Sequence, residues 1–143
     1  MVITPHLLAG AAIGAHSPNV WAAFCFGFIS HYLLDSLPHW EYLNNLKLTR
    51  LIYFVKIFID FIIAMIIVSF IAWPLKLMII FGIIGALLPD IIEFLHQSCK
   101  IKIFRPLSLF HKKMHYYKRV SLFKGLISQI IIVIISVIML YWG

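Results

Sequence analysis

Two long apolar runs, residues 50–73 and 120–142, constrain the fold of this chain more than any other feature of its sequence. A helix needs about 20 mostly apolar residues to cross a bilayer hydrocarbon layer of roughly 30 Å, and both runs meet that length. A backbone inside the bilayer must satisfy its own hydrogen bonds, so these runs are expected to be helices. We therefore predict an all-α, polytopic integral membrane helical bundle with short interfacial helices, formed as a single membrane-embedded domain over residues 1–143.

Composition excludes the alternatives to a membrane protein. The chain is 63% apolar and only 12% charged, whereas a soluble domain is about 45–50% apolar and about 25% charged. These proportions exclude a soluble globular domain and a disordered chain. The net charge of +7 comes from basic residues between the apolar runs. Membrane lipids, and not nucleic acid, are therefore the expected partners.

Proline residues divide the chain into helices. Thr4-Pro5 and Ser17-Pro18 each place a hydroxyl residue before a proline, a pattern typical of a helix N-cap followed by the first helical residue. Pro74 and Pro89 are expected to end the helices that precede them. The predicted helices are residues 5–15, 18–37, 50–73, 75–88, 91–97, 108–117 and 120–142.

Basic residues predict how the bundle is oriented. Lys and Arg are concentrated in residues 40–50 and 99–119, whereas the opposite side has only Lys76. The positive-inside rule then predicts a multi-pass protein of the cell inner (plasma) membrane, with a cytoplasmic N-terminus and an outside C-terminus. The helices over 5–15 and 75–88 are too short to span a bilayer. They need shielding by longer helices or by a second copy, so a homodimer is left open.

Histidine and acidic residues are expected to converge at the cytoplasmic face. His31 and Asp35 are four residues apart and share one helix face, as do His111 and His115. Mixed imidazole and carboxylate ligands suit zinc best, with manganese or iron as alternatives, and the number of ligands suffices for one or two ions. The candidate metal ligands are His6, His31, Asp35, His39, Asp90, His111 and His115, and the candidate catalytic residues are Asp90 and Glu93, with Glu93 as general base.

Each candidate also has a structural interpretation. Asp90 could cap the helix that follows it. The basic stretch around His111 and His115 could bind anionic lipid. In the third helix, Lys56 and Asp60 are expected to neutralise each other across one turn. Ionisable groups inside membrane segments are costly, which favours a functional interpretation for the others.

A short internal repeat links two of the candidate acids. Residues 26–35 align without gaps on residues 81–90, with Phe, Gly, Ile, Leu and the final Asp identical. Each copy would bring one Asp, Asp35 or Asp90, to the same membrane face. A duplication and a chance match of apolar sequence both remain open.

Three motifs resemble one known family. They are Thr4-Pro5-His6-Leu7-Leu8-Ala9-Gly10, Ser30-His31-x-x-x-Asp35-x-x-Pro38-His39 and Leu87-Leu88-Pro89-Asp90. They resemble the small inner-membrane proteins described as membrane-bound metal-dependent hydrolases, a family with LexA-regulated members. The His-x-x-x-Asp element is more distantly similar to zinc-dependent phospholipase C. The chain departs from the family in order, because its His-x-x-x-Asp precedes Leu-Pro-Asp.

The resemblance implies metal binding at the candidate residues and a hydrolytic reaction. The leading hypothesis is a metal-dependent hydrolase of a phosphoester, such as a lipid headgroup or a lipid-linked phosphate. The alternatives are a non-enzymatic divalent-metal-binding or transport protein and a small structural membrane subunit. The sequence has no nucleophile elbow, Walker A loop or dinucleotide fingerprint, so serine-hydrolase, nucleotide-driven and redox-cofactor mechanisms lack support.

Overall fold

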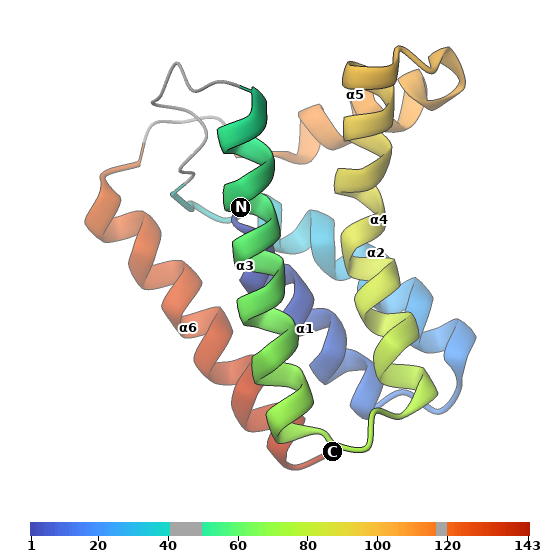
Figure 1. Cartoon of the computed structure of the whole chain (residues 1–143), viewed down its shortest axis with the longest axis vertical. Coiled ribbons are helices and arrows are strands. Elements are labelled where there is room, and N and C mark those ends of the chain that lie inside the picture. Colours follow the sequence, from blue (N-terminus) through green and yellow to red (C-terminus); the bar gives the residue numbers. More distant parts are fainter. Residues whose placement is uncertain (41–49, 117–119) are drawn as a thin grey trace.

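The computed structural model describes residues 1–40, 50–116 and 120–143, and this part of the chain is helical with no strand. The prediction of an all-α fold is confirmed (Figure 1). In chain order the elements are α1 (Ile3–Ala15), α2 (Val20–Asp35), α3 (Arg50–Ile71), α4 (Leu77–Cys99), the 3-10 turn η1 (Lys102–Phe104), α5 (Arg105–Met114) and α6 (Leu122–Tyr141).

Three of these helices, α3, α4 and α6, are long and apolar enough to span a membrane. The predicted break at Pro89 is wrong, because α4 continues through Pro89 to Cys99 as one helix. A proline inside a helix costs about 3 kcal/mol, since it removes a hydrogen bond and crowds the preceding turn. Pro89 is buried, and α4 packs along α1 and α2. We attribute the continuity of α4 to this tertiary packing.

The predicted N-cap at Thr4 is also wrong. Helix α1 begins at Ile3, and the residue before it, Val2, makes no side-chain cap. Asp60 of α3 takes this role from across the bundle. Its Oδ2 accepts from the backbone N–H of Ile3 at 2.6 Å and of Thr4 at 3.3 Å, while Thr4 Oγ1 donates to Oδ1. A carboxylate is favourable there because the first turn of a helix leaves N–H groups without internal partners.

Helix α2 likewise begins and ends slightly inside its predicted limits. Its N-cap is Asn19, whose side chain accepts from the N–H of Ala22 at 2.9 Å. Ser17 does not cap this helix; its hydroxyl donates to the Ile13 carbonyl at 2.7 Å. The helix ends at Asp35, and a turn leads to Pro38.

Glycines allow α1, α2 and α4 to pack with their backbones in close contact. A Cβ added to Gly82 would lie 2.2 Å from the Gly10 carbonyl oxygen, and one added to Gly27 would lie 2.3 Å from the Gly82 carbonyl oxygen. Small residues permit such close approach between membrane helices. Gly27 and Gly82 are matching positions of the internal repeat, so its two copies meet across the α2–α4 interface.

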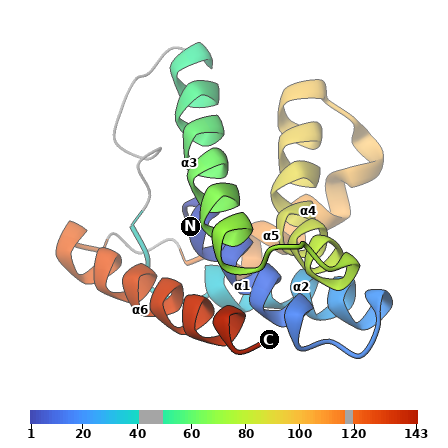
Figure 2. The same cartoon turned by 60° about the horizontal axis from the view of Figure 1, so that its bottom comes forward.

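The start of α1 and the end of α2 lie at mid-height in the bundle (Figure 1). At 1.5 Å per residue, α1 is about 20 Å long and α4 about 35 Å long. Helix α1 packs against α2, α3, α4 and α6, which shield it within one chain (Figures 1 and 2). The start of α1 and the end of α2 therefore place their polar residues inside the bundle.

Candidate metal centre

The Asp35 carboxylate, at the end of α2, is the centre of the polar cluster. The residue is 1% exposed. Its Oδ1 lies 2.9 Å from the Met1 amino group and 3.1 Å from His6 Nε2. Its Oδ2 lies 3.0 Å from His111 Nε2 and 3.2 Å from His31 Nε2. A buried carboxylate surrounded by imidazoles is a strong site for cations, because burial weakens the screening of its charge.

His31 shows where a cation would bind. Its Nδ1 lies 2.7 Å from the carbonyl oxygen of Ala86. A carbonyl only accepts, so Nδ1 carries a ring proton, and Nε2 points into the cluster. Nε2 then faces Asp35 Oδ2 at 3.2 Å and Asp90 Oδ1 at 3.6 Å, with no hydrogen-bond partner in the described part of the chain. These acceptors repel each other unless a proton or a metal ion lies between them.

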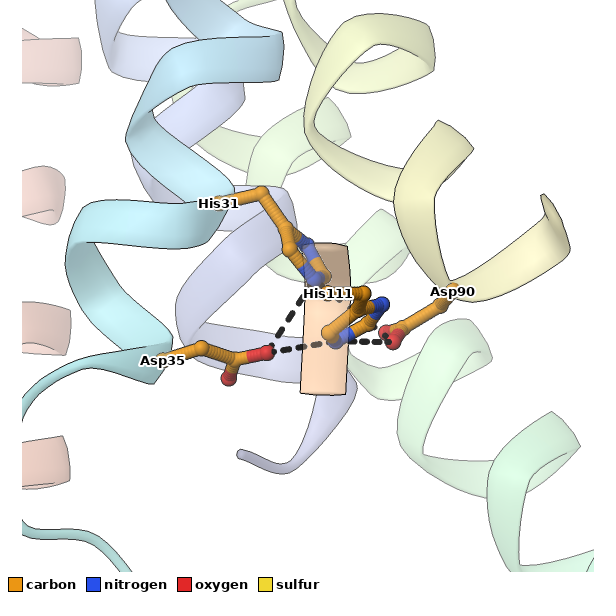
Figure 3. A group of neighbouring side chains, drawn as sticks. All are labelled: His31, Asp35, Asp90 and His111. Carbon is orange, nitrogen blue, oxygen red and sulfur yellow. Dashed lines mark hydrogen bonds and ion pairs between the residues drawn. The ribbon is translucent and has the colours of Figure 1, made fainter. Parts of the chain in front are cut away.

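The first group of ligands comes from three helices (Figure 3). It consists of His31 and Asp35 from α2, Asp90 from α4 and His111 from α5, whose ligand atoms all lie within 4.8 Å of one another. Ligands about 2.1 Å from a tetrahedral zinc ion lie about 3.4 Å apart. The separations between the imidazole nitrogens and the carboxylate oxygens of this group range from 3.0 Å to 3.9 Å. The donor set and its spacing therefore fit a zinc-like ion.

A second group shares Asp35 with the first. It consists of Asp35, His39 and His115, again within 4.8 Å of one another. His39 lies beyond the end of α2, and its Nδ1–H donates to the Leu37 carbonyl at 2.8 Å, which leaves Nε2 as the ligand nitrogen. The ring centroids of His39 and His115 are 4.8 Å apart. One carboxylate belonging to two ligand groups is the arrangement expected of a two-ion centre.

The charges around His111 hold its proton in the absence of metal. Burial by itself would lower the pKa of this imidazole. The hydrogen bond to Asp35 and the negative charges of Asp90, Asp35 and Glu93 outweigh burial and raise the pKa above its ordinary value of 6.5. A metal ion at this position would therefore compete with a proton more strongly than at an ordinary histidine.

The structure places the remaining two candidates beside these groups. His6 is fully buried, its Nε2 contacts Asp35, and its ring stacks on His31 with centroids 4.1 Å apart, but it belongs to neither ligand group. Glu93 lies about one turn after Asp90 and also belongs to neither group. Its Oε1 contacts Gln97 and lies 3.4 Å from Lys112 Nζ, while its Oε2 has no hydrogen-bond partner among the described residues. The roles of His6 as ligand and Glu93 as base stay predictions.

Two contacts, one in the site and one at the start of α1, were not predicted from the sequence. The Ala86 carbonyl orients His31, and nothing in an apolar run marks one backbone oxygen. The one local signal is Pro89, which has no N–H to donate to the Gly85 carbonyl four residues earlier, next to Ala86. Asp60 was visible as a charge within an apolar run, but its partner at the start of α1 was not.

No family model, curated protein or solved structure matches this chain.

Proposed function

We propose that this protein is a membrane-bound metal-dependent hydrolase of a phosphoester, with zinc as the best-suited metal and manganese or iron as alternatives. The observation that carries the proposal is the Asp35 carboxylate shared by two groups of mostly buried residues that could bind a metal ion. The position of His31 Nε2, which faces the carboxylates of Asp35 and Asp90, supports it. The motif resemblance to membrane-bound metal-dependent hydrolases points to the same chemistry.

The proposed centre holds two ions through the residues of its two groups. The ligands are His31, Asp35, Asp90 and His111 for one ion and Asp35, His39 and His115 for the other. Bound ions would lower the pKa of a coordinated water and neutralise charge on a phosphoester. His6, whose Nε2 lies 3.1 Å from Asp35 Oδ1, is a further candidate ligand of the same centre.

The residues around the centre would handle the proton and the substrate charge. Glu93 is our general base, because its Oε2 has no hydrogen-bond partner in the described chain and the residue lies about one turn from Asp90. Lys112, 3.4 Å from Glu93, is placed to attract an anionic phosphoester. We further propose that the protein spans the inner membrane with its N-terminus in the cytoplasm, because its loop lysines and arginines favour that orientation.

Metal content is the first test. Elemental analysis of detergent-purified protein should find up to two equivalents of zinc, manganese or iron, lost in a His31→Ala/Asp35→Ala variant. The matched control is His16→Ala/His96→Ala, which removes two histidines bonded to backbone carbonyls outside the groups. If the first variant does not fold, Asp90→Asn provides a milder second variant. It is expected to weaken the binding of the first ion. Retention of the metal in both folded variants would overturn the site.

Turnover is the second test. Metal-loaded protein should hydrolyse a phosphodiester or phosphomonoester in a screen, and chelation followed by metal return should abolish and restore the activity. Metal binding without turnover on water-soluble or lipid phosphoesters would overturn the hydrolase and favour a non-enzymatic metal-binding protein. No bound metal, even after reconstitution with excess ion, would favour a structural subunit.

A further inference from the structure

An apolar groove lies beside the metal centre, between α3 and α4. It has a volume of about 560 Å³ and is lined by the start of α1, by one face of α3 and by one face of α4. Figures 1 and 2 show that α3 and α4 both flank α1 and stand apart from each other along their upper halves. The Phe54 and Phe94 rings bridge the two helices, with centroids 5.5 Å apart.

The two walls of the groove differ in chemistry. The α3 wall is apolar throughout and consists of Phe54, Ile57, Phe58 and Phe61. The α4 wall carries polar groups, Asp90 and Glu93, beside apolar ones such as Phe94. His115 also lines the groove. The groove is therefore continuous with both ligand groups, through Asp90 of the first and His115 of the second.

An apolar wall facing a wall with carboxylates favours an amphiphile as the occupant of the groove. Helices α3 and α4 are both long and apolar enough to span a membrane, so an opening between them faces lipid chains. A water-soluble phosphoester gains little free energy from contact with a wall of three phenylalanines and an isoleucine. An acyl chain gains binding free energy there in proportion to the apolar area that it buries. The groove volume of about 560 Å³ lies within the range of about 300–1,000 Å³ that is typical of small-molecule sites.

We propose that the α3–α4 groove holds an acyl chain of a phospholipid whose phosphoester reaches the metal centre at Asp90 and His115. This inference rests on the proposed function and narrows its substrate class to membrane lipids with a phosphoester headgroup. The chain lies against the phenylalanines of α3, and the polar end lies against α4.

Photolabelling tests the groove without relying on activity. The probe is a phosphatidylglycerol with a diazirine on one acyl chain. It is mixed into detergent micelles that contain the zinc-loaded full-length protein. Mass spectrometry then maps the labelled residues. Labels should be concentrated on residues 54–61 and 87–94. Ile57→Trp, which fills the groove, should lower this labelling about tenfold, because the chain loses apolar contact area.

The matched control is Ile59→Trp, the same substitution two residues away on an exposed position of α3 that does not line the groove. It should leave the labelling unchanged. If Ile57→Trp does not fold, Ile57→Phe and Ile59→Phe replace the pair. Labels spread evenly over the exposed faces of α3, α4 and α6, or unaffected by Ile57 substitution, would overturn the inference. A photocrosslink between two copies of the chain at the groove would overturn it as well.

Elemental analysis of the same samples separates the two proposals. Bound zinc without groove labelling would overturn the lipid site and leave the metal centre intact. Groove labelling in protein that binds no metal would support the lipid site and overturn the proposed hydrolase.

Discussion

The inner helices α1, α2 and α4 and the outer helices α3 and α6 differ in how closely their backbones pack against one another. The inner helices pack through Gly10, Gly27 and Gly82, with backbones too close for an added Cβ. The outer helices present isoleucine and phenylalanine outward, and about half of the surface of residues such as Ile63 and Ile131 is exposed. Close packing shields polar groups, whereas an apolar outer face needs only to be compatible with lipid.

This difference explains where the candidate metal ligands are found. Buried charges are tolerated only when they are paired or bind a cation. Asp35 and His31 meet this condition at the end of α2, where the neighbouring helices bury both side chains. The outer helices still contribute single polar groups that face inward, such as Asp60 of α3. The comparison therefore predicts that inner positions are sensitive to small changes and outer ones are tolerant of large ones.

The largest effect is expected at Asp35. Asp35→Asn removes the negative charge that both ligand groups share, so nearly all bound metal should be lost. His39→Ala should remove only the second ion and halve the metal content. The control Gln129→Ala changes a buried polar residue of an outer helix and should retain all metal. Elemental analysis measures each, and full metal content in His39→Ala would remove the second group from the site.

A single methyl group should distinguish the packing of the two regions. Gly82→Ala places a Cβ against the backbone of Gly10, and overpacking of this kind costs about 1–3 kcal/mol. Ile131→Phe adds far more volume on an exposed face of α6 and should change the unfolding free energy by less than about 0.5 kcal/mol. Thermal or denaturant unfolding in detergent gives both values. Equal losses of stability would contradict the contrast between inner and outer helices.

The inner site should also respond to pH. The raised pKa of His111 stabilises the metal-free protein at low pH, and this contribution is lost as the pH rises through that pKa. Zinc needs the deprotonated ring, so its affinity should fall as the pH is lowered from about 7.5 to about 5.5. The increase in Tm on adding zinc should shrink over this range in the wild type and equally in Gln129→Ala. A zinc-induced shift that does not vary with pH would argue against His111 as a ligand.

The smallest effect is expected where the two regions meet. Asp60→Asn keeps the shape of the cap on α1 and removes its charge, at an expected cost of about 1 kcal/mol. Thr4→Ser keeps the hydroxyl that donates to Asp60 and should be nearly neutral. Unfolding measurements compare the two variants, while metal content at saturating zinc should not change in either. Loss of metal in Asp60→Asn would show that α3 supports the site directly.

Sequence reasoning predicted most of the helices because their signals are local. The apolar lengths of residues 50–73 and 120–142 predicted α3 and α6 within about two residues at each end. The spacing of His31 and Asp35 correctly placed both on one face of α2, since i and i+4 residues are neighbours on any helix. Pro89 misled the prediction, because a local preference against helix was outweighed by packing that the sequence does not display.

By itself, the sequence determined that this chain is helical, apolar enough for a membrane, and supplied with histidines and acids near helix ends. Those properties depend on composition and on residues a few positions apart. Only the tertiary structure decided that Asp35 serves two ligand groups, because His111 and His115 lie 76 and 80 positions further along the chain. It also decided that Ala86 orients His31 and that Asp60 caps α1. The contact between His31 and Ala86 lies at the α2–α4 interface, where Gly27 and Gly82 let the two backbones approach closely. That distance is a property of the packed bundle.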